Sequence, residues 1–315
     1  MGRRNKGRQV NGILLLNKAL GISSNKALQK VKHLYLAAKA GHTGTLDPLA
    51  TGVLPICFGE ATKFTQFLLD ADKKYSATIR FGISTSSGDA GSKIISELGA
   101  VNLNIEKINN TLAGFRGKIL QIPPMYSALK HEGVRLYELA RKGINIDRKA
   151  RSIEIYSLEV SNFRQGEFPE VDLKVHCSKG TYIRSLAEDI GISLGCGAYV
   201  SKLHRNAVGK FNDNDSITQK ELELIKKVDL MDDLDSLLKP MDAGIQHLME
   251  AYLTEDATFN FCRGQPVVAP QVFRESKEGD IVRVFQQEGL FIGVGEISAN
   301  GKLAPKRLIV CFSVK

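Results

Sequence analysis

One short segment combines residue types that could carry covalent chemistry. Residues 41–55 read GHTGTLDPLATGVLP and place three glycines and two prolines around a single carboxylate, Asp47. This composition suits neither a helix nor a regular strand, so it predicts a shaped loop. Asp47 is the only carboxylate between residue 1 and Glu60, and a lone acid in a basic neighbourhood is what a site needs to place one negative charge beside a polyanion. The structural alternative is an Asp-Pro turn in which Asp47 accepts hydrogen bonds from its own backbone.

The charge around this loop favours a polyanionic partner. The chain has 315 residues, with 43 Lys and Arg against 34 Asp and Glu, a net charge of +9 and a pI near 9.2. Residues 1–63 hold ten basic and two acidic side chains, and residues 116–151 hold nine and three. Residues 220–250 reverse the sign, with eight acids and four bases. The two basic segments are candidate RNA or DNA contacts, although each could be a solvated face.

Several classes of protein are excluded by what the sequence lacks. It has no apolar run of about 18 residues, which excludes a membrane-spanning helix, and no signal-peptide core follows the basic N-terminus. Five scattered cysteines form no C-x-x-C pair, and their odd number argues for buried structural thiols in a reduced, cytoplasmic protein. Metal-ligand spacing, a dinucleotide fingerprint and a phosphate-binding P-loop are all missing, so we expect no metal and no cofactor.

The elements that must position Asp47 mix strands and helices. Period-2 alternation predicts strands at 75–81 and 171–177, and helical spacing follows at 24–38 and 182–194. Two runs at 281–285 and 290–296 flank Glu288-Gly289, which predicts a hairpin. Because the elements show no strict βαβ rhythm, we expect an α+β fold with a mixed, mainly antiparallel sheet.

The loop and several further motifs resemble the TruB-type bacterial tRNA pseudouridine-55 synthases. The matching motifs, in chain order, are NK at 17–18, GISS at 21–24, GHTGTLDPLATGVLP at 41–55, GEATK at 59–63, KY at 74–75, PPMYSALK at 123–130, SKGTYIRSL at 178–186, LHR at 203–205 with Gly209, GVGE at 293–296 and LAPKR at 303–307. They cover nearly the whole chain. One departure is Ala19, where the family usually places Pro after the lysine.

The resemblance implies a division of the chain. A basic flexible arm at residues 1–9 would precede a pseudouridine synthase catalytic domain at 10–245. Within it, an insertion at about 125–151 would clasp RNA. A small β-barrel-like, PUA-type RNA-binding domain would occupy residues 250–315.

The resemblance also implies a reaction and a set of site residues. After base flipping, the T-loop uridine-55 of tRNA is cut from its ribose, turned and rejoined through C5, and no metal or cofactor takes part. Asp47 would be the nucleophile, Arg184 would form the ion pair that orients it, and Tyr75 would stack on the base. The implied substrate-binding residues are His42, Leu203, Lys18, Tyr182 and Asp89.

Two alternatives to this stand-alone enzyme stay open. The first is a tRNA-binding folding chaperone that opens and recloses tRNA independently of catalysis. The second is a guide-RNA-dependent relative of the same superfamily, which the insertion at 125–151 and the compact end domain disfavour. We expect a monomer whose partner is the T-arm stem-loop of tRNA, since the RNA must reach much of the basic face.

Overall fold

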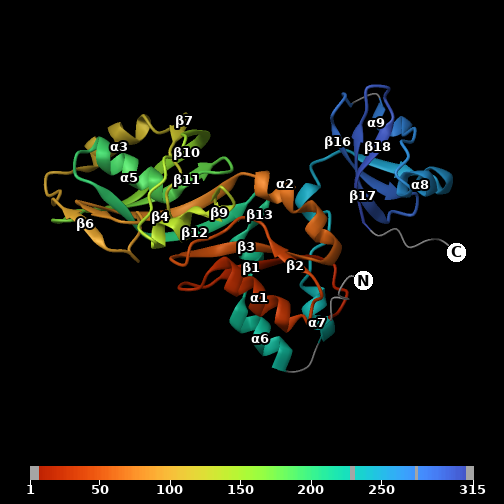
Figure 1. Cartoon of the computed structure of the whole chain (residues 1–315), viewed down its shortest axis with the longest axis horizontal. Helices are drawn as coiled ribbons and strands as arrows, with labels where there is room; N and C mark the ends of the chain where they lie inside the picture. Colours follow the sequence, from red (N-terminus) through yellow and green to blue (C-terminus); the bar gives the residue numbers. More distant parts are fainter. Residues whose placement is uncertain (1–6, 228–230, 274–275, 310–315) are drawn as a thin grey trace.

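The computed structural model describes residues 7–227, 231–273 and 276–309. Figure 1 shows a larger part built on a long twisted sheet and a smaller C-terminal lobe of short strands and helices. The larger part contains the Asp47 loop and all eight predicted site residues.

A ten-stranded sheet runs through the described residues of the larger part. Its main order is β14-β1-β3-β12-β4-β11-β10-β7, with β2 paired to β3 and β13 paired to β12. All neighbours are antiparallel except β1 with β14 and β3 with β12, which confirms the mainly antiparallel prediction. The strands are β1 (Gly12–Lys18), β2 (Ala40–His42), β3 (Ala50–Phe58), β4 (Lys73–Phe81), β7 (Gly117–Gln121), β10 (Arg151–Arg164), β11 (Glu170–Cys177), β12 (Ala198–Val208), β13 (Phe211–Asn212) and β14 (Ile217–Thr218).

Helices cover this sheet and supply much of its core. Those of the larger part are α1 (Ser24–Leu34), η1 (Gly59–Phe64), α2 (Thr65–Asp70), α3 (Ile105–Ala113), α4 (Leu136–Arg141), α5 (Ile183–Ser193), η2 (Asp213–Asp215), α6 (Gln219–Lys227), α7 (Met231–Ser236) and η3 (Ala243–Ile245). Apolar residues of α1, α3 and α5 share one buried cluster with β1, β3, β4, β10, β11 and β12. In Figure 1, α3 and α5 lie together over one part of the sheet, and α1 lies beside β1 and β3.

The predicted helices begin correctly but the first one is shorter than expected. Ser23 caps α1, accepting a hydrogen bond from the Lys26 amide, and α1 ends at Leu34 rather than Ala38. Leu36 has φ of 51°, a left-handed conformation that an α-helix does not continue through. The chain then turns toward β2 and the Asp47 loop.

The insertion at 125–151 is a small hairpin followed by one short helix. Strands β8 (Lys130–His131) and β9 (Val134–Arg135) pair antiparallel, and α4 follows directly. Leu136 is buried, whereas most other side chains of the insertion are exposed or half-buried. A second small hairpin, β5 (Ile83–Thr85) with β6 (Ile94–Glu97), flanks residues 86–93.

The C-terminal lobe is an open sheet in its described residues. Strands β15 (Glu250–Leu253), β16 (Ile281–Gln286), β17 (Phe291–Ile297) and β18 (Leu303–Leu308) pair in that order, with α8 (Glu255–Cys262) and α9 (Pro270–Phe273) packed near them. The predicted hairpin is confirmed as β16 and β17, which are antiparallel. The barrel-like expectation is corrected to a four-stranded sheet that does not close among the described residues.

The lobe is attached to the larger part by apolar and charged contacts. Phe64 of η1 and Ile245 of η3 pack against Phe285, Phe291 and Val294 in one buried cluster. The buried Arg283 donates to Asp242 at 2.7 Å, and the Lys63 ammonium donates to the Leu308 carbonyl at 2.7 Å.

Residues 1–6 of the predicted flexible arm lie outside the described residues. The described end of the arm is held, because the Arg8 amide donates to the Leu36 carbonyl at 2.7 Å and its guanidinium pairs with Asp235.

The cysteines differ from expectation at one position. Cys57, Cys177 and Cys196 are buried free thiols, whereas Cys262 is disulfide-bonded, and Cys311 lies outside the described residues. The expectation of a reduced thiol at every cysteine is therefore wrong for Cys262.

No described helix is both long and apolar enough to span a membrane.

Candidate active site

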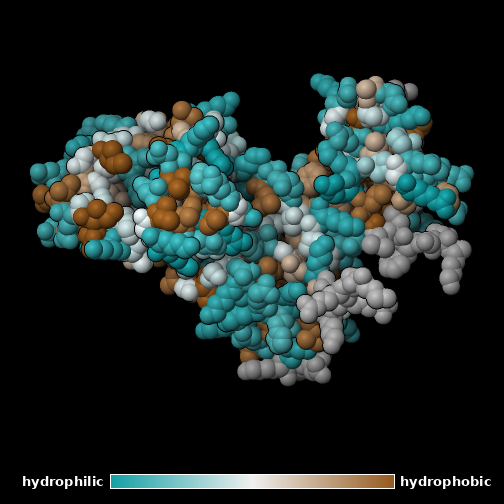
Figure 2. Space-filling model, viewed as in Figure 1, coloured by the Kyte–Doolittle hydropathy of each residue, from teal (hydrophilic) through white to brown (hydrophobic). Residues whose placement is uncertain are grey.

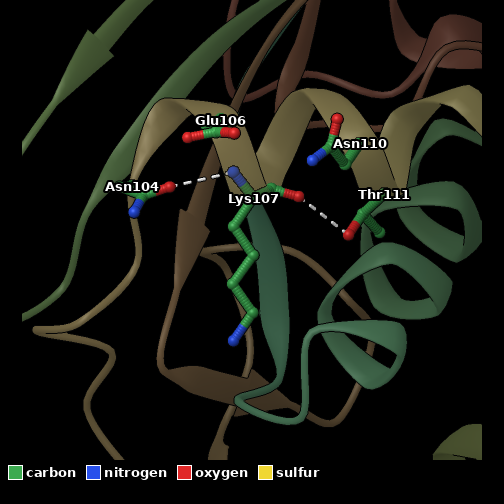
Figure 3. Close-up of a pocket in the computed structure, with 5 residues that line it drawn as sticks. All are labelled: Asn104, Glu106, Lys107, Asn110 and Thr111. Atoms are coloured by element: carbon green, nitrogen blue, oxygen red, sulfur yellow. Dashed lines mark hydrogen bonds between the residues drawn. The ribbon is translucent and has the colours of Figure 1, made fainter.

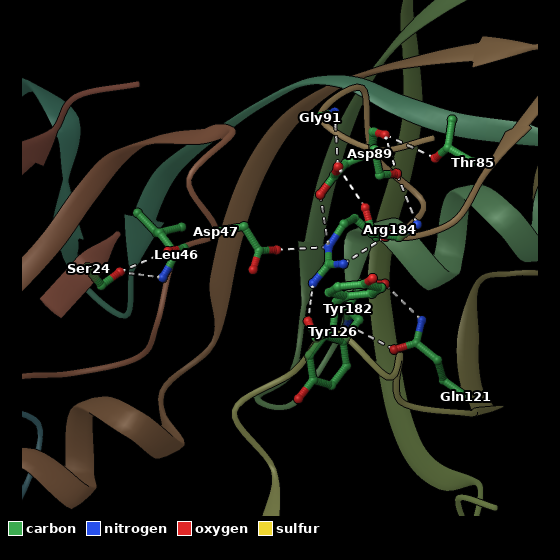
Figure 4. Close-up of polar contacts among 12 residues, drawn as sticks. Ser24, Leu46, Asp47, Thr85, Asp89, Gly91, Gln121, Tyr126, Tyr182 and Arg184 are labelled. Atoms are coloured by element: carbon green, nitrogen blue, oxygen red, sulfur yellow. Dashed lines mark hydrogen bonds and ion pairs between the residues drawn. The ribbon is translucent and has the colours of Figure 1, made fainter. Parts of the chain in front are cut away.

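The Asp47 loop connects β2 to β3 and is held by hydrogen bonds from outside it. Ser24, at the start of α1, donates to the Leu46 carbonyl at 2.9 Å and accepts from the Leu46 amide at 2.7 Å (Figure 4). The Gly21 amide donates to the Pro48 carbonyl at 2.8 Å. A buried hydroxyl with both roles satisfied fixes the residue next to the carboxylate, so Asp47 projects from a rigid support.

The side chain of Asp47 points to Arg184 rather than to its own backbone. Its Oδ2 accepts a 2.8 Å hydrogen bond from Arg184 Nε, and the Asp47 side chain stays 34% exposed. The Asp47 carbonyl does accept from the Ala50 amide, so a turn is present. The structural alternative is correct for the backbone and wrong for the carboxylate, which keeps one oxygen for other contacts.

Arg184 holds three separate chain segments with one planar group. Beyond Asp47, it donates to the Ser87 carbonyl and to the Tyr126 carbonyl, each at 2.7 Å (Figure 4). It lies in the first turn of α5 and its side chain is only 3% exposed. A guanidinium offers fixed, diverging donors, so the three acceptors leave it little rotational freedom. Sequence periodicity alone would place this residue on the surface of its helix.

The protonation of Asp47 is set by opposing effects. Burial raises the pKa of this carboxyl above its ordinary value, and the nearby charge of Asp89 raises it further. The Arg184 charge and hydrogen bond lower the pKa, as does the Lys18 charge. Arginine therefore offsets part of the desolvation, as its pairing with a carboxylate should, and the net shift is upward.

Asp89 is a second carboxylate near Nε of Arg184. Its Oδ2 lies 3.9 Å from Arg184 Nε, and its Oδ1 accepts from the Ser87 hydroxyl at 2.9 Å and the Gly91 amide at 3.1 Å. Ser87 is also the residue whose carbonyl Arg184 binds. Asp89 thus orders the turn that receives Arg184, which fits a supporting part rather than a second nucleophile.

Tyr75 and Leu203 lie on one face of adjacent strands. Leu203 pairs with Ala77 and Arg205 pairs with Tyr75 across the β12–β4 ladder, so all four side chains share a face of the sheet. Leu203 is buried and Tyr75 is half-buried. Burial raises the pKa of the Tyr75 phenol, and the Asp47 charge raises it further, which puts the ring within electrostatic reach of the carboxylate.

Lys18 and Tyr182 also lie within electrostatic reach of Asp47. Lys18 is fully buried and donates to the Ala19 and Ile22 carbonyls at 2.9 and 2.8 Å, and burial lowers its pKa to about 8. Tyr182 precedes α5, and its backbone is held by both ends of the Gln121 amide, at 2.8 and 3.0 Å. Asp47 perturbs the pKa of both side chains, so the structure gathers them around one carboxylate.

His42 has a different environment. It lies at the end of β2, where burial lowers the pKa of the ring and the Arg205 charge lowers it further. Its Nδ1 is buried without a hydrogen-bond partner among the described residues. A buried polar atom without a partner is costly, so this ring is a candidate for a contact with a bound molecule.

Sequence reasoning missed Arg205 as a site residue. It was present in the LHR motif at 203–205, and two places after Leu203 on a strand it must share the Leu203 face. A charge on the buried face of a strand was the available signal. The two backbone carbonyls that receive Arg184 carried no signal in the sequence, because a carbonyl belongs to every residue type.

Two hollows on the surface lie away from these residues. One of about 420 Å³ lies at α3 and is lined by Asn104, Glu106, Lys107, Asn110 and Thr111 (Figure 3). Another of about 360 Å³ lies next to it, between residues 98–103 and Leu194. Among the described residues, no cluster of His, Cys, Asp and Glu is arranged to hold a metal ion.

Most of the chain matches the domains of one protein family. Residues 32–183 match the TruB family pseudouridylate synthase N-terminal domain, and residues 184–246 match the tRNA pseudouridylate synthase B C-terminal domain. Residues 250–309 match the C-terminal domain of pseudouridine synthase II TruB.

Relatives named tRNA pseudouridine synthase B align over nearly their full length. Those of Saccharophagus degradans and Colwellia psychrerythraea are each 47% identical, over 98% of this chain and 99% of theirs. Among solved structures, a Cbf5–Nop10–Gar1 complex matches with a TM-score of 0.70 and 26% identity, covering 96% of this chain and 84% of that chain. The archaeal box H/ACA Nop10–Cbf5 complex has the same fold, with a TM-score of 0.69 at 23% identity, covering 95% and 86%.

The mixed sheet and the matching domains define a pseudouridine synthase, an isomerase that acts on RNA. Within that class, the chain belongs to the TruB family.

Proposed function

We propose that this protein isomerises uridine-55 in the T-loop of tRNA to pseudouridine, with Asp47 as the nucleophile. The observation that carries the proposal is the 2.8 Å Asp47–Arg184 pair, in which the arginine is buried and the carboxylate remains 34% exposed. The names of the full-length relatives support tRNA as the substrate. Identity of 47% to these relatives, against 26% to a Cbf5 chain, favours a stand-alone enzyme over a guide-RNA-dependent one.

The reaction needs only the groups of this site and the substrate. The N1–C1′ bond breaks, the uracil turns, the C5–C1′ bond forms, the C5 proton leaves and N1 gains a proton. Asp47 would form and release a covalent adduct, which divides one difficult exchange into two steps. Arg184 would keep Asp47 ionised and oriented once the base covers it.

Holding the base would fall to the residues around the carboxylate. Removing a base from its stack costs a few kcal/mol, and stacking on one aromatic side chain returns about 1–3 kcal/mol. Tyr75 would supply that stack, and Leu203 would form the apolar wall beside it. Lys18, Tyr182 and Asp89 would line and support the site, and His42 would contact the opened loop through its unpartnered Nδ1.

Affinity would come from other parts of the chain. The insertion at 125–151 would clasp RNA through its basic side chains, and the lobe at 250–315 would be a PUA-type RNA-binding domain. Residues 10–245 would form the catalytic domain and 1–9 a basic arm. Contacts to phosphates fix register without reading sequence, so recognition would rest on the shape of the T-loop. We place the enzyme in the cytoplasm, as a monomer.

Mapping of the modified nucleotide tests the proposal directly. The purified protein is incubated with an unmodified tRNA transcript, and pseudouridine is located along the RNA. The expected product is a single pseudouridine at position 55. A matched transcript with cytidine at that position should stay unmodified, and modification elsewhere in either RNA would contradict the proposed target.

A further inference from the structure

Arg205 is a second buried arginine whose surroundings differ from those of Arg184. Its side chain lies in the interior, and the residue is only 1% exposed. Among the described residues, no carboxylate lies within ion-pair distance of its guanidinium. Buried arginines are ordinarily paired with an acid, because desolvation of the charge is otherwise uncompensated. The groups that the guanidinium binds must therefore explain why this charge is buried without an acid.

The guanidinium binds both ends of the Asp47 loop. Its Nε donates to the Val53 carbonyl at 2.8 Å, and its NH2 donates to the Gly44 carbonyl at 3.2 Å. These carbonyls lie on either side of Asp47, three residues before it and six residues after it. One planar group therefore sets the separation of the two chain ends from which the carboxylate projects.

The backbone of Arg205 fixes the same segment a second time. Arg205 pairs with Gly52 in the parallel β12–β3 ladder. Gly52 has φ of 101°, and a Cβ there would lie 2.3 Å from the Arg205 carbonyl oxygen. Only glycine allows β3 to approach β12 this closely. The backbone and the side chain of Arg205 thus both fix the position of the loop that contains Asp47.

Arg205 also lies next to Tyr75, which is on β4, the other strand that neighbours β12. Arg205 and Tyr75 are direct partners in the antiparallel β12–β4 ladder. The Arg205 charge lowers the pKa of the Tyr75 phenol against the raising effect of burial. Arg205 therefore lies between the nucleophile's loop and the ring that would stack on the base.

We propose that Arg205 is a positioning residue that sets the spacing between Asp47 and Tyr75, acting through the Gly44 and Val53 carbonyls and the Tyr75 hydroxyl. This inference rests on the proposed function. Arg205 is a positioning residue rather than a catalytic one, since its donors are directed at the protein. Misplacement of a reacting group by about 1 Å can cost 10²-fold in rate. Small displacements of the Arg205 guanidinium should therefore lower the rate of the chemical step.

The first test is R205K, with R164K as the matched control. Lysine keeps the charge and loses the planar donors. Among the described residues, Arg164 binds Glu170 and Asp172 at the end of β10 and no site residue, so R164K reports the cost of this exchange at a position that is 40% exposed. We expect kcat of R205K to fall at least about tenfold with the Kd for tRNA within about threefold, and R164K to leave both unchanged. Wild-type kcat in folded R205K would overturn the proposal.

A double-mutant cycle with Y75F separates positioning from a general loss of stability. Y75F removes the hydroxyl whose pKa the Arg205 charge lowers and keeps the ring. If Arg205 acts partly through that hydroxyl, the loss of kcat in Y75F/R205K will be smaller than the product of the two single losses. Additive losses, or a kcat loss that tracks the drop in Tm, would show a structural role only and refute the proposal.

Two further measurements cover the cases in which R205K does not fold or the wild type makes no product. If R205K does not fold, R205Q retains amide donors without a buried charge, and the same criteria apply to it. Wild-type enzyme is assayed in parallel on the tRNA transcript. Pseudouridine formation by wild type with unimpaired R205K or R205Q refutes the positioning role alone, whereas no product from wild type refutes the proposed function instead.

Discussion

The site and the clasp, which we define as residues 125–151, differ in how firmly they are held. Around Asp47, hydrogen bonds from Ser24, Arg184 and Arg205 fix the loop and its neighbours, and the two arginines are buried. In the clasp only Ser127 and Leu136 are buried, while its basic side chains are mostly exposed. The contrast suggests a division between a fixed part that does chemistry and an adaptable part that binds RNA.

The two regions are joined by a hydrogen bond to the Tyr126 carbonyl. Tyr126, at the beginning of the clasp, accepts the third hydrogen bond of Arg184 at 2.7 Å. The charge that pairs with Asp47 is thus attached to the beginning of the clasp. If the division is correct, changes on one side of this junction should alter rate, and changes on the other side should alter affinity.

Asp47→Asn should produce the largest effect and separates the two roles most sharply. The amide keeps the shape of the side chain but removes the nucleophilic charge. We expect product formation to fall at least about a thousandfold, while the Kd for tRNA changes less than about tenfold, or about 1.4 kcal/mol. Single-turnover assays and filter binding measure the two quantities on the same preparation.

Asp47→Asn also decides between the enzyme and the chaperone. A variant that folds tRNA but makes no pseudouridine would show that both activities exist and that only one needs Asp47. Pseudouridine formation at the wild-type rate would eliminate Asp47 as the nucleophile.

Arg184→Lys should give the next largest effect. Lysine keeps one positive charge but cannot serve Asp47, the Ser87 carbonyl and the Tyr126 carbonyl together. We expect kcat to fall on the order of 10²-fold with a modest loss of tRNA affinity. R164K serves as the control for the arginine-to-lysine exchange. Wild-type turnover in R184K would mean that the pairing with Asp47 is dispensable.

Changes in the clasp should reverse this pattern. Lys142 and Lys149 are exposed, so K142Q/K149Q removes two charges with little effect on packing. We expect the Kd for tRNA to rise about three- to tenfold near 0.1 M salt, with a shallower salt dependence, and kcat at saturating tRNA to stay within about twofold.

A matched control for the clasp is K220Q. Lys220 is exposed in the acidic segment at α6, where no RNA contact is expected. Because K220Q removes one charge and the clasp variant removes two, an equal loss of affinity per charge removed would indicate an effect of net charge. A salt response that is flat in the wild type would show that phosphate contacts contribute little.

Some parts of the fold could be predicted from the sequence and others could not. Asp47 and its loop were visible because three glycines, two prolines and one acid leave few structural options, and the strands at β4 and β11 followed from their alternation. The end of α1 was missed because Leu36 adopts a left-handed conformation that no residue type announces. The open C-terminal sheet departed from the barrel expected by resemblance.

Long-range contacts explain why part of the site was also missed. Arg184 was found through the family resemblance and not through periodicity, because its partners lie 58 to 137 positions away in sequence. Two of those partners are backbone carbonyls, which no motif can mark. Arg205 likewise depends on β12 lying between β3 and β4, an order that the sequence does not state. Local pattern therefore singled out Asp47 and its loop, and the order of the strands determined what holds them.

The smallest effect that we predict concerns the pH dependence of the fixed region. The Asp89 charge contributes to the raised pKa of Asp47, so D89N removes one of the causes of that shift. The ionised carboxylate is the reactive form, and activity should therefore fall as pH drops through the pKa of Asp47. In D89N the fall of kcat/KM on the acidic side of the pH profile should move to lower pH, because the Asp47 carboxylate ionises more easily. The clasp variant should keep the wild-type pH profile, since its lysines affect binding, and an unmoved pH profile in D89N would remove Asp89 from the electrostatics of the site.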